Sequence, residues 1–465
     1  MTELHCDYLV IGSGAVGMAF VDTMLSESDA SFLIVDNHHQ PGGHWNDAYP
    51  FVRLHQPSHF YGVASTPLGS KTIDQTGPNA GFYELAGVAE VQSYFEQLMR
   101  QRFLPSGRVQ YLPMCEAQFD GTVRNLLSGE VTTVDVRQRI VDSTFFHTSV
   151  PSRHRRSFAE APGVRCIAPN ALPIEAPSAQ SFCVLGAGKT AMDTLVWLLN
   201  NGVAEDDIAW VCPRRSWMIN RKVTQASVEF FRSSIGGFAG QLQALAEGTS
   251  PEDIFDRLEA SGFMIRVDPT QRPTMFHYAT ISEGEVAQLQ RIERIIEGRR
   301  VQSIEREGLQ MTDGSTEALP ADTLYVDCTA SAVDFKNPPM RPAFEDQRIT
   351  IQAVRVPNPC LSAAVTAYVE AHYEDDVTRN RLCNPVPLPD DERGFLRSTL
   401  GNMMNQVTWS AEPELSAFVT NCRLDGFGAV IRDADTTDPE NQAILEKMGR
   451  FAQPAAENLM RLLSG

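Results

Sequence analysis

A glycine-rich turn between an apolar run and a helical pattern most constrains the fold of this chain. Residues 7–36 read DYLVIGSGAVGMAFVDTMLSESDASFLIVD. The run YLVI is expected to form a buried parallel strand, and Gly12, Gly14 and Gly17 follow it in GxGxxG spacing. A helical pattern and a second apolar run that ends in Asp36 complete the sequence. Strand, glycine turn, helix, strand and acid in this order predict a dinucleotide-binding Rossmann unit.

Each small residue of this turn has its own task. Gly12 allows the tight turn, Gly14 lets the backbone approach a pyrophosphate, and Gly17 lets the helix pack closely on the strand. The free N–H groups at the helix N-terminus suit phosphates, and Asp36 is expected to accept hydrogen bonds from an adenosine ribose. The residues predicted to contact this first nucleotide are Gly12, Ser13, Gly14, Ala15, Val16, Gly17, Asp36 and Asn37.

The same pattern returns about 170 residues later, in SFCVLGAGKTAMDTLVWLLNNGVAEDDIAWVCPRRSW, residues 181–217. Here the second strand does not end in an acid, and Arg214 and Arg215 follow it. An arginine at this place accommodates a 2′-phosphate, which favours NADPH; the alternative is a solvated pair of loop arginines. The residues predicted to contact this second nucleotide are Gly186, Ala187, Gly188, Lys189, Thr190, Arg214 and Arg215.

Composition narrows the classes of protein further. The 465 residues are 43% hydrophobic and 21% charged, which is enough for two or three domains with buried cores. A net charge of −19 argues against nucleic acid or an anionic membrane as a partner. The nine scattered cysteines form no CxxC pair, which argues against a structural zinc site and a redox disulfide. Their odd number and the absence of a signal peptide predict a cytoplasmic location.

A motif behind the first unit identifies a family. Residues 42–62 read GGHWNDAYPFVRLHQPSHFYG. GGHW resembles the GGxW of class B flavoprotein monooxygenases, which comprise flavin-containing monooxygenases, Baeyer–Villiger monooxygenases and N-hydroxylases. The rest resembles the Baeyer–Villiger pattern YPGxRxDxPSxxY, and the chain is identified as a divergent member of the class over roughly 1–220 and 300–365. The matching residues are Tyr49, Pro50, Arg53, Pro57, Ser58 and Tyr61.

The resemblance implies an α/β fold with two three-layer, Rossmann-like dinucleotide-binding domains. The NADPH domain is inserted into the FAD domain and carries a helical insert over about 220–300. The expected divisions are 1–170 for the first part of the FAD domain, 171–320 for the NADPH domain with its insert, and 321–465 for the second part of the FAD domain and a C-terminal tail.

The resemblance also implies an activity. FAD takes a hydride from NADPH, reacts with molecular oxygen and, through a flavin C4a-(hydro)peroxide, oxygenates a small organic substrate. His55 would protonate or hydrogen-bond the peroxide or orient the substrate, although a buried structural histidine is the alternative. Arg272, in QRPTMFHY, resembles the arginine of the family's Lys-Arg-Pro segment. The residues expected against the flavin are Gly43, His44, Trp45, Arg53, Leu54, His55 and Gln56, with Gln352 and Ser362 near its ring.

Departures from the family pattern keep other functions open. His55 stands where the Baeyer–Villiger group has an aspartate, FFHTSVPSRHRRSF (145–158) lacks the glycine of the linker signature, and TLYVDCTASAVDF (323–335) has CTAS in place of ATG. The alternatives are an NADPH-dependent flavin oxidase or reductase without oxygen insertion and a degenerate nucleotide-binding flavoprotein. No metal site is expected from His38, His39 and His44, which share one loop. Substrate, type of oxygenation, roles of the insert and tail, and oligomeric state, including a homodimer, stay open.

Overall fold

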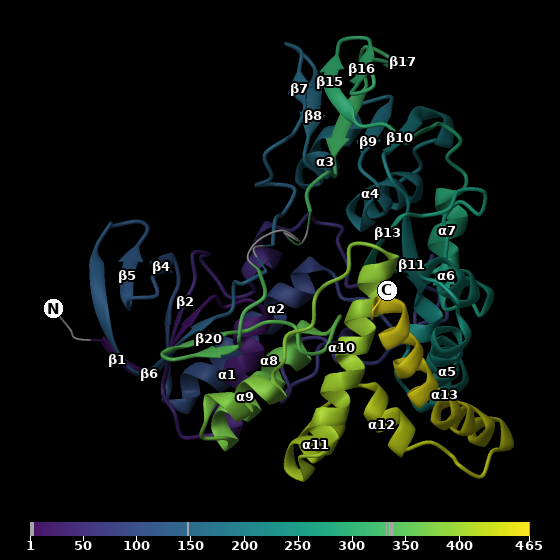
Figure 1. Ribbon diagram of the computed structural model, residues 1–465. Coiled ribbons are helices and arrows are strands. Elements are labelled where there is room, and N and C mark those ends of the chain that lie inside the picture. The colour runs from purple at the N-terminus through teal and green to yellow at the C-terminus, as the bar shows by residue number, and fades with distance from the viewer. Residues whose placement is uncertain (1–3, 147, 332, 334–338, 465) are drawn as a thin grey trace.

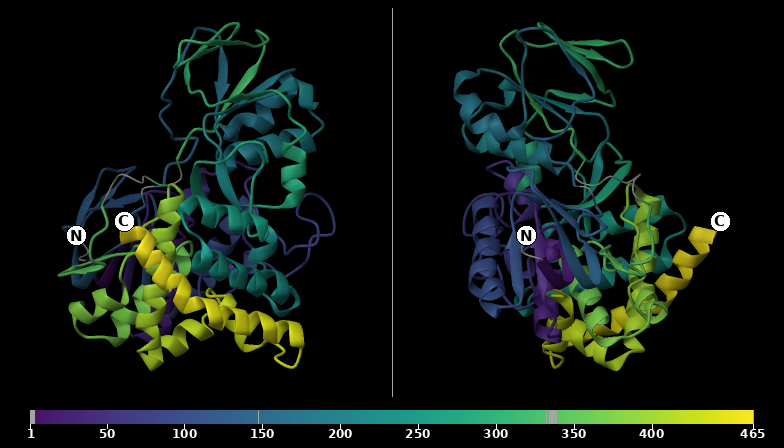
Figure 2. Two further views of the ribbon diagram at one scale, coloured as in Figure 1. Left: turned by 45° about the vertical axis from the view of Figure 1, so that its right-hand side comes forward. Right: turned by 90° about the vertical axis from the view of Figure 1, so that its left-hand side faces the viewer.

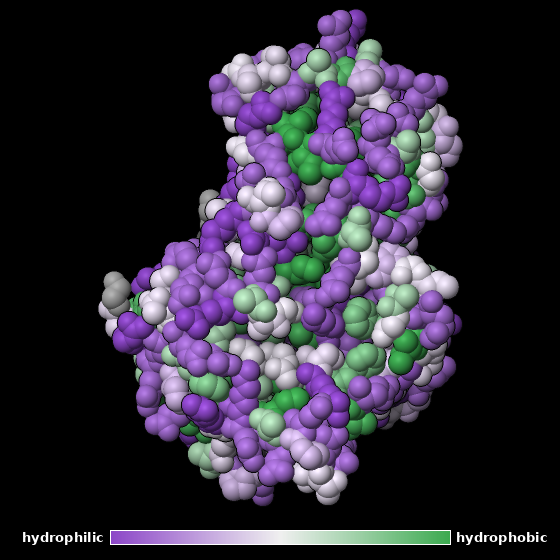
Figure 3. Space-filling view, turned by 90° about the vertical axis from the view of Figure 1, so that its right-hand side faces the viewer, coloured by the Kyte–Doolittle hydropathy of each residue, from purple (hydrophilic) through white to green (hydrophobic). Residues whose placement is uncertain are grey.

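The protein is described by a computed structural model that covers residues 4–146, 148–331, 333 and 339–464 (Figure 1). Two mostly parallel sheets form separate layers, and a group of helices lies beside them. From the side, a narrower upper lobe stands on a wider lower part, and apolar patches are scattered over a largely hydrophilic surface (Figure 3). The predicted α/β fold with two Rossmann-like units is confirmed.

The first sheet surrounds the first glycine turn. Its strands run in the order β19-β20-β6-β1-β2-β3, and β1 pairs in parallel with both β2 and β6. The hairpin of β4 and β5 joins β6 in antiparallel pairing. The elements are β1 (Leu4–Ile11), β2 (Phe32–Val35), β3 (Val109–Leu112), β4 (Cys115–Ala117), β5 (Thr122–Asn125), β6 (Val131–Asp142), β19 (Phe344–Glu345) and β20 (Arg348–Thr350).

Both faces of this sheet are buried, because its strands are apolar on both sides. Tyr8 and Val10 of β1 point into a core shared with the helices, whereas Leu9 points into a second core with the β4–β5 hairpin. The helices on the first face are α1 (Ala15–Glu27), α2 (Val88–Leu98) and α8 (Pro359–His372), and α1 packs directly on α8. The three layers are therefore helices, sheet and β-hairpin.

The second sheet repeats this arrangement in the upper lobe of Figure 1. All its strands are parallel, in the order β14-β10-β9-β18-β8. Helices cover one face, and a four-stranded sheet of β7 (Ala159–Glu160), β15, β16 and β17 covers the other; its pairings are antiparallel except that of β7 with β15. The elements are β8 (Arg165–Ile167), β9 (Phe182–Leu185), α4 (Lys189–Asn200), β10 (Ile208–Cys212), α7 (Glu283–Leu289), β14 (Ile295–Glu297), β15 (Val301–Glu305), β16 (Gly308–Met311), β17 (Thr316–Ala318) and β18 (Leu324–Asp327).

The second unit takes in more of the chain than 171–320. β8 precedes that range, and β18 follows it and pairs with β9 at the centre of the second sheet. The sequence interpretation assigned the strand before Asp327 to the returning first unit, because strand pairing between distant segments leaves no local pattern. Part of the return segment 323–335, namely 332, 334 and 335, lies outside the described residues.

The insert is not purely helical, and it forms one body with the tail. Its helices α5 (Phe231–Glu247) and α6 (Pro251–Ala260) adjoin a three-stranded sheet of β11 (Ser216–Asn220), β12 (Met264–Ile265) and β13 (Met275–Ile281). The tail helices α10 (Glu392–Ser410) and α13 (Pro439–Ser464) pack against them, and α13 lies along α5 (Figure 2). Five buried side chains fill this junction: Trp217, Phe255, Phe276, Phe395 and Leu459.

Local sequence sets these helices. Ser250 accepts a hydrogen bond from the Asp253 amide at 3.2 Å and Pro251 occupies the first turn, so α6 begins where a cap and a proline coincide. Among the described residues, none of the helices has both the length and the apolar character needed to cross a membrane.

Leu459→Ala should lower the free energy of unfolding by about 2 to 5 kcal/mol, because a fully buried side chain at the junction of tail and insert leaves a cavity. Denaturant unfolding of the whole chain measures this change. Met460→Ala is the control, because Met460 is 48% exposed and its loss should change little. Equal effects of the two substitutions would contradict the packing of α13 on the insert.

Candidate functional site

The first glycine turn has no room for side chains at two of its positions. Gly12 has φ +101°, and a Cβ there would lie 2.7 Å from Ser143 Oγ. A Cβ on Gly17 would lie 2.2 Å from the Gly12 carbonyl oxygen. No side chain caps the N-terminus of α1. The amides of its first turn are therefore left for an external acceptor, which suits a phosphate group.

The GGHW loop lies directly on this turn. The Gly42 amide donates to the Ser13 carbonyl at 2.9 Å, and a Cβ on Gly43 would lie 2.8 Å from Gly14 Cα. Gly43 itself has φ +55°. Two stretches of bare backbone thus meet at Gly14 and Gly43, in a cradle that any larger side chain would fill.

Asp36 is already engaged within the protein. Its Oδ2 accepts from the amide and the hydroxyl of Ser13 at 2.6 and 2.8 Å, and its Oδ1 accepts from the amide of His38 and contacts the His38 ring at 2.9 and 2.8 Å. Burial favours the neutral acid, but the bonds from His38 and Ser13 hold the pKa of Asp36 below its usual value. A ribose hydroxyl would have to displace one of these bonds, and the expected contact of Asp36 with the ribose stays a prediction.

Trp45 and residues 53–56 take different positions. Trp45 is buried, and its Nε1 donates to the Tyr61 hydroxyl at 2.7 Å, which fixes the ring in the core beside the loop. Leu54 is buried as well, whereas Arg53 is exposed and donates to the Leu85 carbonyl at 3.2 Å. His55 and Gln56 are half-buried, and His44 and Asn37 are exposed.

The second glycine turn repeats the geometry of the first. Gly186 has φ +125°, and a Cβ there would lie 2.6 Å from the Cys328 carbonyl oxygen. Trp210 Nε1 donates to the Gly186 carbonyl at 2.7 Å and holds the turn against β10. Helix α4 begins at Lys189, and its N-cap residue is Gly188, so no side chain caps this end of the helix. Its first amides are therefore open to a phosphate in the same way.

A repeated tetrapeptide packs against the glycine of each turn. This repeat was not identified from the sequence. VDST ends β6 and VDCT ends β18. In each, the aspartate Oδ1 accepts from the amide and the hydroxyl of the threonine two residues on: Asp142 from Thr144 at 3.0 and 2.9 Å, Asp327 from Thr329 at 3.0 and 2.6 Å. The likeness of the two tetrapeptides was a signal that could have revealed this pairing.

A buried cluster of charges joins three parts of the chain. Lys189, in the second turn, is ion-paired with Asp193 of α4 and, at 2.8 Å, with Glu285 of α7. Arg221, which follows β11, pairs with Glu285 at 2.6 Å. Tyr49, from the loop behind the first turn, donates to Asp193 at 2.8 Å. The Lys189 ammonium thus has two carboxylate partners within the protein, and its expected contact with a nucleotide stays a prediction.

His55 lies beside this cluster. Arg221 Nε donates to the His55 carbonyl at 3.5 Å. Burial lowers the pKa of the imidazole to about 4, helped by the cations Lys189 and Arg221 and opposed by the carboxylates of Asp193 and Glu285. The ring is therefore neutral at neutral pH, when one nitrogen donates a hydrogen bond and the other accepts one.

Three predicted residues face other partners. Arg272 is exposed, pairs with Asp256 and Glu392, and lies over the Trp217 ring, on the insert–tail body and not beside His55. Ser362 is fully buried, and its hydroxyl accepts from the amides of Val354 and Arg355, both at 3.1 Å. The Gln352 amide group bonds the backbone of Arg341 at 2.6 and 3.3 Å. Each of the three therefore has partners within the protein. The catalytic role expected of Arg272 and the flavin contacts expected of Gln352 and Ser362 stay predictions.

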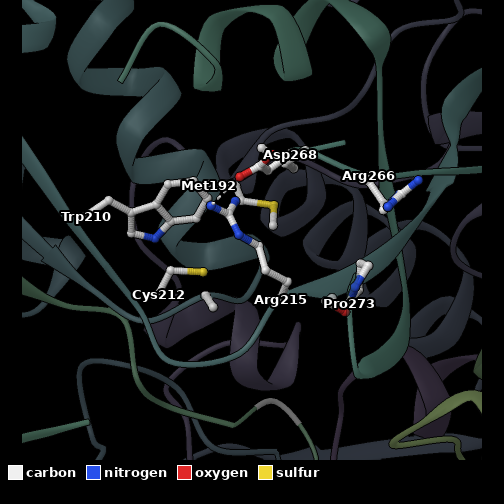
Figure 4. A pocket seen from close by; sticks show the side chains of 10 residues that line it. Met192, Trp210, Cys212, Arg215, Arg266, Asp268 and Pro273 are labelled. Carbon is white, nitrogen blue, oxygen red and sulfur yellow. Dashed lines mark hydrogen bonds and ion pairs between the residues drawn. The ribbon is translucent and has the colours of Figure 1, made fainter. Parts of the chain in front are cut away.

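Arg214 and Arg215 separate at the end of β10. Arg214 is exposed, whereas Arg215 is buried, with its guanidinium 5.3 Å from the centroid of the Trp210 ring. Figure 4 shows Arg215 pointing into a small pocket near Trp210, Met192 and Asp268. Ala187 of the second glycine turn also lines this pocket, so it lies at the end of the second nucleotide-binding turn.

No protein-family model matches the chain. An uncharacterized protein of Mycobacterium bovis and one of Mycobacterium tuberculosis are each 41% identical to it over 460 residues, which is 99% of this chain and 85% of the relative. The chain belongs to the same protein family as these two mycobacterial proteins.

Solved structures that resemble the chain include enzymes of the class that the sequence resembles. One is a cyclohexanone monooxygenase bound to cyclohexanone, at 12% identity and a TM-score of 0.49, over 97% of this chain and 99% of that one. A flavin-containing monooxygenase from Stenotrophomonas maltophilia has 16% identity and a TM-score of 0.41 over 76% and 86%. A bacillithiol disulfide reductase from Bacillus cereus has 13% and 0.45 over 80% and 100%. At such identities and scores, an activity does not follow from the likeness.

Glu285→Gln should lower the free energy of unfolding by about 3 kcal/mol, because Lys189 and Arg221 would lose a shared anion in a buried place. Denaturant unfolding at neutral pH measures it. Glu283→Gln is the matched control: Glu283 is 66% exposed and pairs with an exposed Lys222, so its loss should change stability by less than about 1 kcal/mol. A small effect of Glu285→Gln would show that the cluster does not hold these parts together.

His55 should make the protein less stable in acid. Its pKa falls from 6.5 to about 4 on folding, so between these values the unfolded chain binds the proton more tightly. The stabilising contribution of the neutral His55 ring to the free energy of unfolding is complete above about pH 6.5 and is lost as the pH falls towards about 4. Unfolding free energies at about pH 7.5 and about pH 5 should therefore differ less in His55→Gln than in the wild type. The exposed His39→Gln serves as control, and an unchanged difference in His55→Gln would contradict the assignment.

Proposed function

We propose that this chain, a member of the family that includes the two mycobacterial proteins, is an oxidoreductase that binds FAD at the first glycine turn and NADPH at the second. In this proposal it acts as a class B flavoprotein monooxygenase that uses molecular oxygen on a small organic substrate. The proposal rests on the chain's own residues, together with the GGHW and YP…PSHFY motifs of residues 42–62.

The observation that carries the proposal is that one loop contacts both nucleotide-binding turns. At its start, Gly43 lies on Gly14 of the first turn. Further on, Tyr49 donates to Asp193, one helical turn beyond Lys189 of the second turn. His55 follows at the charge cluster that contains Lys189. Two nucleotides held by these turns would both extend towards the same loop, as transfer of a hydride from one to the other requires.

The residues at each turn fit the two cofactors. Bare backbone at Gly12, Gly14 and Gly43 admits a pyrophosphate closely, and the uncapped N-termini of α1 and α4 supply amides to it. When bound, FAD accepts a hydride from NADPH and passes the electrons on to oxygen. The protein's own part is to orient the two nucleotides and to keep water out of the space between them.

His55 is the residue proposed to act at the reacting centre. Because its imidazole is neutral at neutral pH, it donates a hydrogen bond from one nitrogen and accepts one at the other. A neutral ring stabilises a reacting oxygen by hydrogen bonding and does not deliver a proton as readily as an imidazolium would. Of the roles expected for His55 from the sequence, the neutral ring therefore favours hydrogen bonding to the peroxide over its protonation.

The cysteines argue against disulfide reduction, the activity named for one of the solved structures. All nine are free, and burial raises the pKa of each thiol. Disulfide exchange needs an accessible thiolate with a low pKa, usually with a second cysteine beside it. The rival that remains is an NADPH-dependent flavin oxidase or reductase without oxygen insertion.

The test is to reduce the purified protein with NADPH without oxygen, then mix it with oxygen while following flavin absorbance and hydrogen peroxide. We expect a long-lived absorbance unlike oxidised or reduced flavin. In His55→Gln its lifetime should fall by about tenfold, the effect of one lost hydrogen bond, whereas the exposed His39→Gln should leave it unchanged.

Two results would contradict the proposal. Immediate return to oxidised flavin with one peroxide per NADPH would favour the oxidase or reductase. Bound flavin that NADPH does not reduce would indicate a protein that binds nucleotides without this chemistry.

A further inference from the structure

We propose that Glu297 determines the nucleotide preference of the second site by neutralising Arg215, so that NADPH is favoured over NADH only slightly. This inference rests on the proposed binding of a nicotinamide nucleotide at the second turn. The arginines at this site attract the 2′-phosphate, and the inference adds a residue that repels it.

The geometry begins with the place of Glu297 in the sheet. It is the last residue of β14, which pairs in parallel with β10, and in that register it stands opposite Cys212, the last residue of β10. Ligands of doubly wound sheets bind at these carboxyl ends of the strands, where the second strand normally presents the group that meets the ribose. In this chain the acid of that edge comes from β14 instead of β10.

Arg215 is held at this edge by acids. Its Nη2 is ion-paired with Glu297 and lies 3.5 Å from Asp268 Oδ2. The Arg215 side chain is only 8% exposed, whereas that of Glu297 is 33% exposed. The Glu297 carboxylate is therefore the more exposed member of this ion pair.

The rest of the Arg215 guanidinium lies over the Trp210 ring and has no hydrogen-bond partner among the residues that the structure describes. Its Nε and Nη1 are buried and make no hydrogen bond. Both belong to a side chain that points into the pocket at the second glycine turn, next to Ala187 and Trp210 (Figure 4). Buried guanidinium nitrogens are rarely left unpaired, and the space beside these two is the size of a water molecule, so a water is the acceptor that fits them.

The other charges near this pocket are also compensated. Arg266, on the opposite wall, makes a two-point ion pair with Glu259, with both N–O distances 2.7 Å. Arg214 is exposed, and no ion pair of the described residues includes it. An incoming 2′-phosphate would therefore be attracted by Arg214, attracted only weakly by the neutralised Arg215, and repelled by Glu297.

The experiment measures nucleotide binding and does not depend on turnover. NADP⁺ and NAD⁺, and the fragments adenosine 2′,5′-bisphosphate and 5′-AMP, are titrated into the full chain while tryptophan fluorescence is recorded, because Trp210 lies under Arg215. The variants are Glu297→Gln and, as a second removal of charge at the same pocket, Asp268→Asn. Glu293→Gln is the matched control, because Glu293 is exposed and lies just before β14.

We expect the wild type to bind NADP⁺ only a few-fold more tightly than NAD⁺. Glu297→Gln should tighten NADP⁺ and adenosine 2′,5′-bisphosphate by about tenfold at low salt, and leave NAD⁺ and 5′-AMP unchanged. Asp268→Asn should act in the same direction and more weakly, because its carboxylate is farther from Arg215. Glu293→Gln should change nothing.

Three results would overturn the inference, and they are distinguishable. Weaker binding of the 2′-phosphorylated ligands in both pocket variants would show that the acids only position Arg215. An equal change for all four ligands would show no role in preference. If the wild type binds none of the four, the proposed second nucleotide site fails, and the inference fails with it.

Discussion

The pairing of Lys189 and Arg221 with the shared carboxylate of Glu285 is the interaction on which the arrangement of the site depends. The three side chains are at most 10% exposed, so their charges have little water to solvate them. Each then depends on the others, because an ion left alone in such a place costs several kcal/mol. They come from the second glycine turn, the segment after β11, and α7, and Tyr49 adds the loop of the first unit through Asp193. One cluster therefore sets the relative positions of both turns and the loop between them.

The two Rossmann-like units share the packing of their glycine turns and differ in the charged residue that follows the second strand of each unit. Both place a positive-φ glycine against a V-D-x-T tetrapeptide at the end of a later strand. In the first unit the acid after the second strand, Asp36, is bound to Ser13 and His38. In the second unit the arginine at that place, Arg215, is bound to Glu297. At both sites a charged group that a ribose would meet is already occupied by a neighbour.

A residue of the C-terminal tail holds a loop of the first unit by hydrogen bonds. Arg423 is mostly buried, and its guanidinium donates to the carbonyls of His59, Tyr61 and Thr66, among others. Burial lowers the pKa of Arg423, and nearby groups, Asp22 among them, oppose this shift. The segment that follows His55 is thus held by a residue more than 350 positions away. This is a physical reason for the tail and the loop to act as one body.

Sequence alone determined the features that depend on neighbours along the chain. Strand, glycine turn and helix follow each other within a few residues, so Gly12 and Gly186 could be placed at their turns, and the two units followed. The tertiary structure decided which partner each charged or polar side chain has. By position, Lys189 and Ser362 were expected to contact a cofactor and Arg272 to act in catalysis. In the structure, Glu285 of α7 pairs with Lys189 and Glu392 of the tail pairs with Arg272. These partners lie 96 and 120 positions away, so no pattern in the local sequence could indicate them.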